Sequence, residues 1–97
     1  MHFIAFWEYR AEDTEKTIQK LRKRMAEMEK TTKTFAKLVF GPYTFNGETK
    51  GFSVYETDDP DKLTNLAIFY HPEMTWKFVP LIDTQKGAEL WLKMKKK

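Results

Sequence analysis

The chain begins with a run of apolar and aromatic residues that contains almost no polar alternation. Residues 2–9 read HFIAFWEY. A continuous apolar run of this length is typical of a strand that is buried on both faces. We therefore predict that the chain opens with a central strand of a sheet.

The pattern then changes to that of a helix with one apolar side. Apolar residues recur at spacings of three and four, which places them on one face: Ile18, Leu21, Met25 and Met28. Asp13 precedes this stretch and is expected to cap the start of the helix. The basic side chains fall largely outside the apolar stripe: Lys20, Arg22, Lys23 and Arg24. We expect them to form its wet face.

Two further strands are predicted on either side of a tight turn. Residues 34–45 form the first and residues 49–57 the second, and Asn46-Gly47 between them is a strong hairpin signal. Gly41-Pro42 is expected to bend or end the first of these strands. Simple alternation then places Val39 and Tyr43 on one face, with Leu38 and Phe40 on the other.

The second half of the chain predicts a helix, a strand and a last helix. Asp59-Pro60 combines an N-cap with a proline at the first helical position. The inner face of that helix is expected to hold Leu63, Leu66, Ala67 and Tyr70, and the helix ends before Pro72. Residues 73–82 form the fourth strand. Asp83 then caps the last helix, whose contact face is expected to be Ala88, Trp91 and Leu92.

The predicted order is β-α-β-β-α-β followed by an extra C-terminal helix, within a single domain over residues 1–97. This is the α+β, ferredoxin-like pattern, in which a four-stranded antiparallel sheet carries two helices on one face. Two helices cover only one side of the sheet. Both sides of the first strand are nevertheless apolar, because Ile4 and Phe6 alternate with Ala5 and Trp7. We expect the second face to be covered by a partner, either nucleic acid or another copy of the chain.

An RNA-binding module is one alternative for that face. Lys50-Gly51-Phe52 matches the start of the motif on the third strand of RNA-recognition domains, whose aromatic residues stack on bases. Val54 and Thr57 stand where further stacking aromatics belong, and Glu56 adds a negative charge. The sequence therefore disfavours nucleic acid and favours a homodimer.

A second observation leads to the same assembly. Part of the chain resembles a known protein family. The residues that carry this resemblance are Gly51-Phe52, Glu56 followed by Asp58-Asp59, Leu63, and WKFVPLID at residues 76–83. In these features residues 51–89 resemble an uncharacterised domain-of-unknown-function family of the dimeric α/β-barrel superfamily. The resemblance implies a ferredoxin-like fold that dimerises sheet to sheet, and it implies no activity. Superfamily relatives include small monooxygenases and isomerases, so a cofactor-free enzyme of that kind is an alternative.

Composition limits the chemistry. The chain has no cysteine, two histidines and a formal net charge of +3. We expect a reducing, cytoplasmic location, no membrane span, no metal site and no cofactor. Glu8 is a candidate carboxylate with a perturbed pKa if it faces inward, but it is interpreted as a strand-end residue that pairs with Arg10 or a helix lysine. His71 is interpreted as a surface or capping residue. Asp58-Asp59 is interpreted as a helix cap.

One feature predicts a hollow between the sheet and its helices. Gly51, Ser53 and Tyr55 alternate along the third strand and are expected to face the helices, where the small side chains leave room. An aromatic hollow with a few polar groups is typical of small-molecule sites. The candidate ligand-binding residues are Trp7, Ser53, Tyr55, Tyr70 and Trp76. The alternative is that large neighbours fill this volume as an ordinary core.

Overall fold

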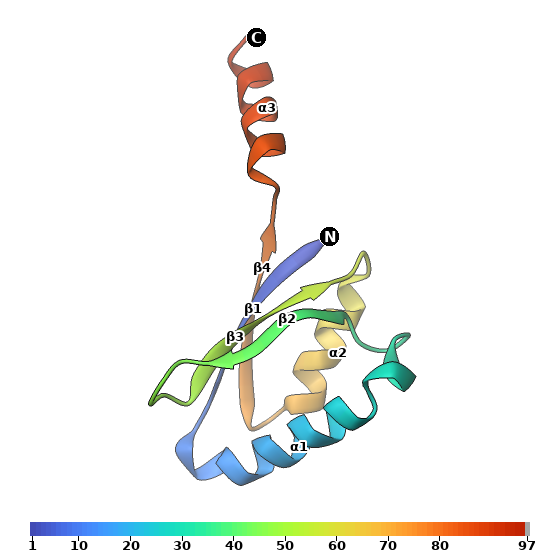
Figure 1. Cartoon of the computed structure of the whole chain (residues 1–97), viewed down its shortest axis with the longest axis vertical. Helices are drawn as coiled ribbons and strands as arrows, with labels where there is room; N and C mark the ends of the chain where they lie inside the picture. The colour runs from blue at the N-terminus through green and yellow to red at the C-terminus, as the bar shows by residue number, and fades with distance from the viewer. Residues whose placement is uncertain (97) are drawn as a thin grey trace.

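A computed structural model describes residues 1–96 of the chain (Figure 1). Its elements follow in this order: β1 (His2–Tyr9), a 3-10 turn (Ala11–Asp13), α1 (Thr14–Ala26), a second 3-10 turn (Met28–Thr31), β2 (Lys37–Thr44), β3 (Lys50–Glu56), α2 (Pro60–Tyr70), β4 (Met74–Leu81) and α3 (Thr84–Lys95). The predicted α+β order, with its additional C-terminal helix, is confirmed.

The four strands form one antiparallel sheet in the order β2-β3-β1-β4. The two strands nearest the ends of the βαββαβ unit, β1 and β4, are thus neighbours, as in the ferredoxin-like pattern. Pairing sets one row of residues across the sheet, in which Thr44, Gly51, Trp7 and Trp76 lie side by side. This row forms part of the wall of the site described below.

The edge strand β2 departs from simple alternation. Its pairing with β3 shifts register between Leu38 and Phe40 and again between Phe40 and Tyr43. Phe40 is opposite Val54, and Tyr43 is opposite Phe52, so both lie on the face that the helices do not cover. The predicted grouping of Phe40 with Leu38 was therefore wrong. Two irregularities in one strand shift the side-chain parity, as β-bulges do.

The helices begin as their capping residues predict, with one exception. The Asp59 carboxylate accepts the backbone N–H of Asp61 at 3.0 Å, and Asp83 does the same for Gln85 at 2.9 Å. Asp13 was expected to cap α1, but its carboxylate instead contacts Arg10 Nε at 3.3 Å. A 3-10 turn before α1 and this ion pair replace the predicted cap.

The core lies between the sheet and α2. α1 and α2 cover the same face of the sheet in Figure 1. The buried apolar residues come from β1, β3, β4, α2 and the segment before β2: Ala5, Trp7, Ala36, Tyr55, Leu63, Leu66, Tyr70 and Met74. Leu66 is fully buried, which agrees with the predicted inner face of α2.

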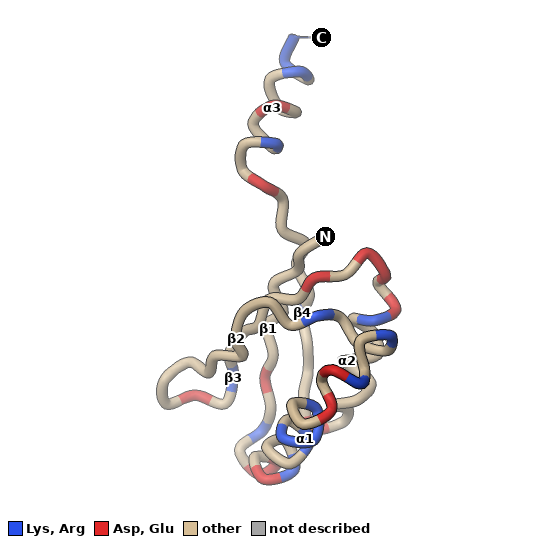
Figure 2. The backbone as a smooth tube through the Cα atoms, turned by 45° about the vertical axis from the view of Figure 1, so that its right-hand side comes forward, with Lys and Arg blue, Asp and Glu red and all other residues tan. Residues whose placement is uncertain are grey.

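The opposite face of the sheet carries an aromatic cluster, formed by the exposed Phe40, Tyr43 and Phe45 and the half-buried Phe52. Their rings lie close together, with 5.1 Å between the centroids of Phe40 and Tyr43 and 6.1 Å between those of Phe45 and Phe52. Figure 2 shows that the strands carry few charges compared with α1. The predicted doubly apolar sheet is confirmed, and we refer to this side as the open face.

The last helix, α3, extends away from the body of the protein (Figure 1). The prediction that Ala88, Trp91 and Leu92 pack against the rest of the chain was wrong for a single chain. Trp91 is 60% exposed and Leu92 is 54% exposed. Lys95 lies over the Trp91 ring at 5.3 Å, which is a contact within the helix itself. No helix formed by residues 1–96 combines the length and the apolar content that crossing a bilayer requires.

Candidate functional site

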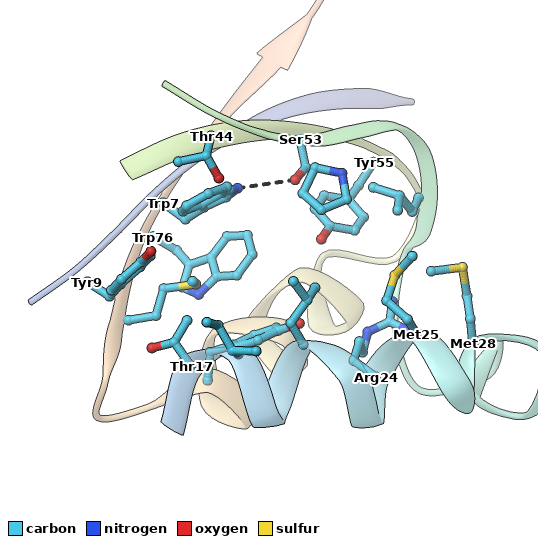
Figure 3. Close-up of a pocket in the computed structure, with 16 residues that line it drawn as sticks. Trp7, Tyr9, Thr17, Arg24, Met25, Met28, Thr44, Ser53, Tyr55 and Trp76 are labelled. Atoms are coloured by element: carbon cyan, nitrogen blue, oxygen red, sulfur yellow. Dashed lines mark hydrogen bonds between the residues drawn. The ribbon is translucent and has the colours of Figure 1, made fainter. Parts of the chain in front are cut away.

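A cavity of about 230 Å³ lies between the helix-covered face of the sheet and α1 (Figure 3). Its walls come from all four strands and from both α1 and α2. Most of the lining side chains are apolar or aromatic: Trp7, Tyr9, Ile18, Leu21, Met25, Met28, Leu38, Pro42, Tyr55, Tyr70, Met74 and Trp76. The polar side chains are Thr17, Arg24, Thr44 and Ser53.

All five candidate residues from the sequence line this one cavity: Trp7, Ser53, Tyr55, Tyr70 and Trp76. The indole Nε1 of Trp7 donates a hydrogen bond of 3.2 Å to Ser53 Oγ, and this bond is buried. Trp76 packs close to Tyr70, with 5.4 Å between ring centroids. Strand alternation thus places Trp7 and Trp76 on one side of the sheet, where Tyr70 of α2 packs against Trp76.

Gly51 does not leave room for a ligand, contrary to the prediction. A Cβ atom at residue 51 would lie 2.6 Å from the Trp7 ring and would also meet the backbone oxygen of Tyr43. The missing side chain is therefore required by close packing between β3, β2 and Trp7. Ser53 is also fully buried, and its hydroxyl has the specific task of receiving the Trp7 N–H.

The most deeply buried positions of α1 lie beside its apolar stripe, although the stripe itself lines the cavity. The buried residues of α1 are Thr17 and Arg24, whereas Ile18 and Met25 are 41% and 47% exposed. In Figure 3 the side chains of Thr17 and Arg24 rise from α1 toward the sheet. The predicted placement of Arg24 on the wet face was wrong. Thr17, Leu21 and Arg24 follow the i, i+4, i+7 spacing of one helix face, which is the signal that could have located Arg24.

Arg24 occupies the end of the cavity nearest the chain segment that follows α1. Its guanidinium lies over the Phe35 ring, 4.5 Å from the centroid. Nη2 donates to the backbone oxygen of Ala36 at 3.4 Å, and Nη1 to Thr31 Oγ1 at 3.5 Å. The side chain is thus held between α1 and the loop before β2, with its charge beside the cavity.

The two buried tyrosines at the cavity stay neutral at physiological pH. Burial raises the pKa of the Tyr55 phenol, while the charge of Arg24 and the Ser53 hydroxyl act in the opposite direction. Burial is also the main cause that raises the pKa of Tyr70; Tyr55 adds to the rise and Arg24 opposes it. Neutral phenols can donate a hydrogen bond to a ligand, but they cannot accept a proton from it.

The remaining candidate residues lie outside the cavity. Glu8 is exposed, and its position in β1 places it on the open face, next to Lys50 and Thr75 in the register of the sheet. His71 is exposed at the end of α2, where its backbone oxygen accepts a hydrogen bond of 2.9 Å from Lys20. Asp58 pairs with the N-terminal ammonium at 2.9 Å. None of these three lines the cavity in the described part of the chain.

The family comparison covers almost the entire fold. A model of the domain of unknown function DUF3303 matches residues 1–95. This chain belongs to the DUF3303 family. Membership of an uncharacterised domain family is what the sequence predicted, while the dimeric barrel of the superfamily stays a prediction. No match to this DUF3303 protein was found among the curated proteins or among the solved structures.

Proposed function

We propose that this DUF3303 protein binds a small, flat, mainly aromatic molecule in the cavity between α1 and the sheet. The observation that supports this proposal is the lining itself, which joins aromatic rings from three strands and α2 to a few polar groups. Such a mixture is typical of small-molecule sites. An apolar cavity of about 150 Å³ is enough for benzene. The volume here, about 230 Å³, therefore has room for a two-ring molecule.

Binding is favoured over catalysis by the groups at the wall. Catalysis by general base would use a side chain at the wall that takes a proton from the substrate. Within residues 1–96 the cavity lining includes no carboxylate and no histidine. Its ionisable groups include the Arg24 guanidinium and the phenols of Tyr55 and Tyr70, whose pKa is raised by burial. We infer a binding protein, with the cytoplasm as its expected location.

Blocking the cavity tests the binding proposal. Thr44 lines the cavity and is exposed, so Thr44→Trp adds bulk there without disturbing the core. We expect 2-naphthol to bind the natural protein and to lose at least about tenfold in affinity in Thr44→Trp, measured by calorimetry. The control is Thr64→Trp, an exposed position on α2 outside the lining. Equal affinity in both variants would contradict binding in this cavity.

We propose further that the open face is covered by a second copy of the chain. In the middle of this face an apolar row crosses the sheet, in which Val79, Ile4, Val54 and Phe40 are neighbours, while charged residues such as Glu8 and Lys50 lie toward its end. An apolar patch of this kind favours a partner that is itself apolar. The same chain supplies such a partner twice, through the aromatic cluster of the open face and through the exposed Trp91 and Leu92 of α3. A symmetric dimer would cover both surfaces. A small domain buries a small fraction of its apolar surface by itself, so such a dimer would add to its stability.

The mass in solution tests this assembly. We expect light scattering to give about twice the monomer mass, and Val54→Lys to shift the protein toward monomer, because Val54 lies between Ile4 and Phe40 on the open face. Thr64→Lys, on α2, is the matched control. A compact monomer at about 100 μM would contradict the dimer. Sub-micromolar binding of single-stranded RNA that Phe52→Ala abolishes would assign the face to nucleic acid instead.

A further inference from the structure

We infer that the molecule held in the cavity is an aromatic acid, whose anionic group pairs with Arg24. This inference rests on the proposed binding function and names the class of ligand. The observation behind it is a buried arginine at the cavity that forms no ion pair with any carboxylate of residues 1–96. Three separate features of the surrounding atoms support it: the missing ion pair, the long hydrogen bonds and the other unpaired donors.

The first feature is the missing counter-charge. Arg24 is 5% exposed, and none of the ion pairs formed within residues 1–96 includes it. A guanidinium keeps its charge in a protein interior, so burial removes its hydration without neutralising it. Buried charges are normally paired for this reason. A bound carboxylate would supply the pair that the chain itself does not.

The second feature is the poor bonding of the guanidinium. The contacts to Thr31 and Ala36 are 3.5 and 3.4 Å long, and no atom of residues 1–96 accepts a hydrogen bond from Nε. Charge-assisted bonds from arginine to carboxylate are normally about 2.7–2.9 Å. The stacking on Phe35 occupies a face of the planar group, so the N–H donors along its edge make only these two long bonds and leave Nε unpaired within residues 1–96. Arginine is suited to bind a carboxylate with two parallel bonds along such an edge.

The third feature is the location of the other unpaired polar atoms. Within residues 1–96 the buried side-chain atoms without a hydrogen-bond partner are Thr17 Oγ1, Arg24 Nε and Trp76 Nε1. All three residues line this cavity (Figure 3). Two of the three atoms can only donate, and the threonine hydroxyl can also donate. Buried polar groups are normally satisfied, so unpaired donors around one volume favour a ligand that is rich in acceptor oxygens.

A purely structural role for Arg24 makes a different prediction. Its contacts with Thr31, Phe35 and Ala36 would then serve only to hold the loop before β2 against α1. Loss of such a role would weaken neutral and anionic ligands equally, because both depend on the same walls. A role in pairing with an anion changes only the affinity for the anionic ligand.

The test compares two probes of the same shape, 2-naphthoate and 2-naphthamide, by calorimetry at neutral pH. We expect the natural protein to bind the acid about ten- to a hundredfold more tightly than the amide, the range that a hydrogen-bonded charge contributes. Arg24→Met should abolish this preference by weakening the acid alone. Arg22→Met, an exposed arginine two residues earlier on α1, makes the same charge change and should keep the preference.

Each outcome decides between the two roles. Equal affinity of the natural protein for acid and amide overturns the inference but leaves the proposed aromatic cavity intact. An equal loss of both probes in Arg24→Met also overturns it, because that result identifies a structural arginine. Absence of binding by either probe at millimolar concentration removes the proposed function as well. If Arg24→Met does not fold, the ratio of the natural protein's affinities for 2-naphthoate and 2-naphthamide still tests whether the cavity prefers an anion.

Discussion

Replacing Gly51 by alanine is expected to destabilise the protein by about 3 kcal/mol or more, the upper range for overpacking a core. The added methyl group would meet the Tyr43 backbone oxygen on β2 and the Trp7 ring at 2.6 Å. The first of these atoms belongs to a paired strand and cannot move alone. Trp7 is held in turn by its hydrogen bond to Ser53. Thermal melting followed by circular dichroism measures the loss.

Gly87→Ala is the matched control for this change. Gly87 lies in α3, and a Cβ atom there would have no neighbour within 4 Å. Alanine is favoured over glycine in a helix by about 1 kcal/mol, so α3 should gain helicity while the body melts as before. A Gly51→Ala protein that melts within a few degrees of the natural one would show that Trp7 and β2 can shift at little cost.

Raising the pH above 10 is expected to destabilise the fold through Tyr55 and Tyr70. Each phenol has an ordinary pKa of 10.0, and burial raises the folded pKa of both. Their contribution is therefore fully present below pH 10 and is lost as the pH rises toward the folded value. The slope of this loss is at most about 1.4 kcal/mol per pH unit for each tyrosine. Urea unfolding at pH 9, 10 and 11 measures it.

Substitution of one tyrosine separates this effect from the titration of lysines. Tyr70→Phe removes one of the two buried phenols, so its stability should fall less steeply with pH than that of the natural protein. Tyr43→Phe changes a ring that is 54% exposed on the open face, and it should follow the natural protein. Parallel curves for all three proteins would be inconsistent with the burial of Tyr70.

The fold was predictable where local signals and hydrophobic periodicity agree. Asp59-Pro60 and Asp83 each placed a helix start correctly, because their carboxylates have no stronger partner than the backbone N–H groups. Asp13 failed in the same role, because Arg10 lies three residues earlier and takes its carboxylate. The candidate cavity residues were found because strand alternation alone assigns Trp7, Ser53 and Tyr55 to one face.

The positions of Phe40 and Arg24 were predicted wrongly, because they depend on tertiary contacts that the local sequence pattern does not contain. Phe40 changes face because β2 has two irregularities in its pairing, and these depend on β3. Arg24 was missed because basic residues on a helix usually form its solvated side. Which side of α1 faces the sheet is set by packing against α2 and the strands. The stripe of apolar residues gives the approximate side only, and here it lines the cavity instead of filling a core.

The irregular edge strand has a consequence for how such a sheet avoids aggregation. A flat, regular edge beside a row of exposed aromatic rings would be a template for strand addition and fibre growth. β2 forms one edge, and its shifted register interrupts the regular row of hydrogen-bonding groups. β4 forms the other, where Pro80 has no N–H to donate and Lys77 adds a charge. Growth along the sheet is thus hindered at both edges, although Phe40, Tyr43 and Phe45 of its open face stay exposed in a single chain.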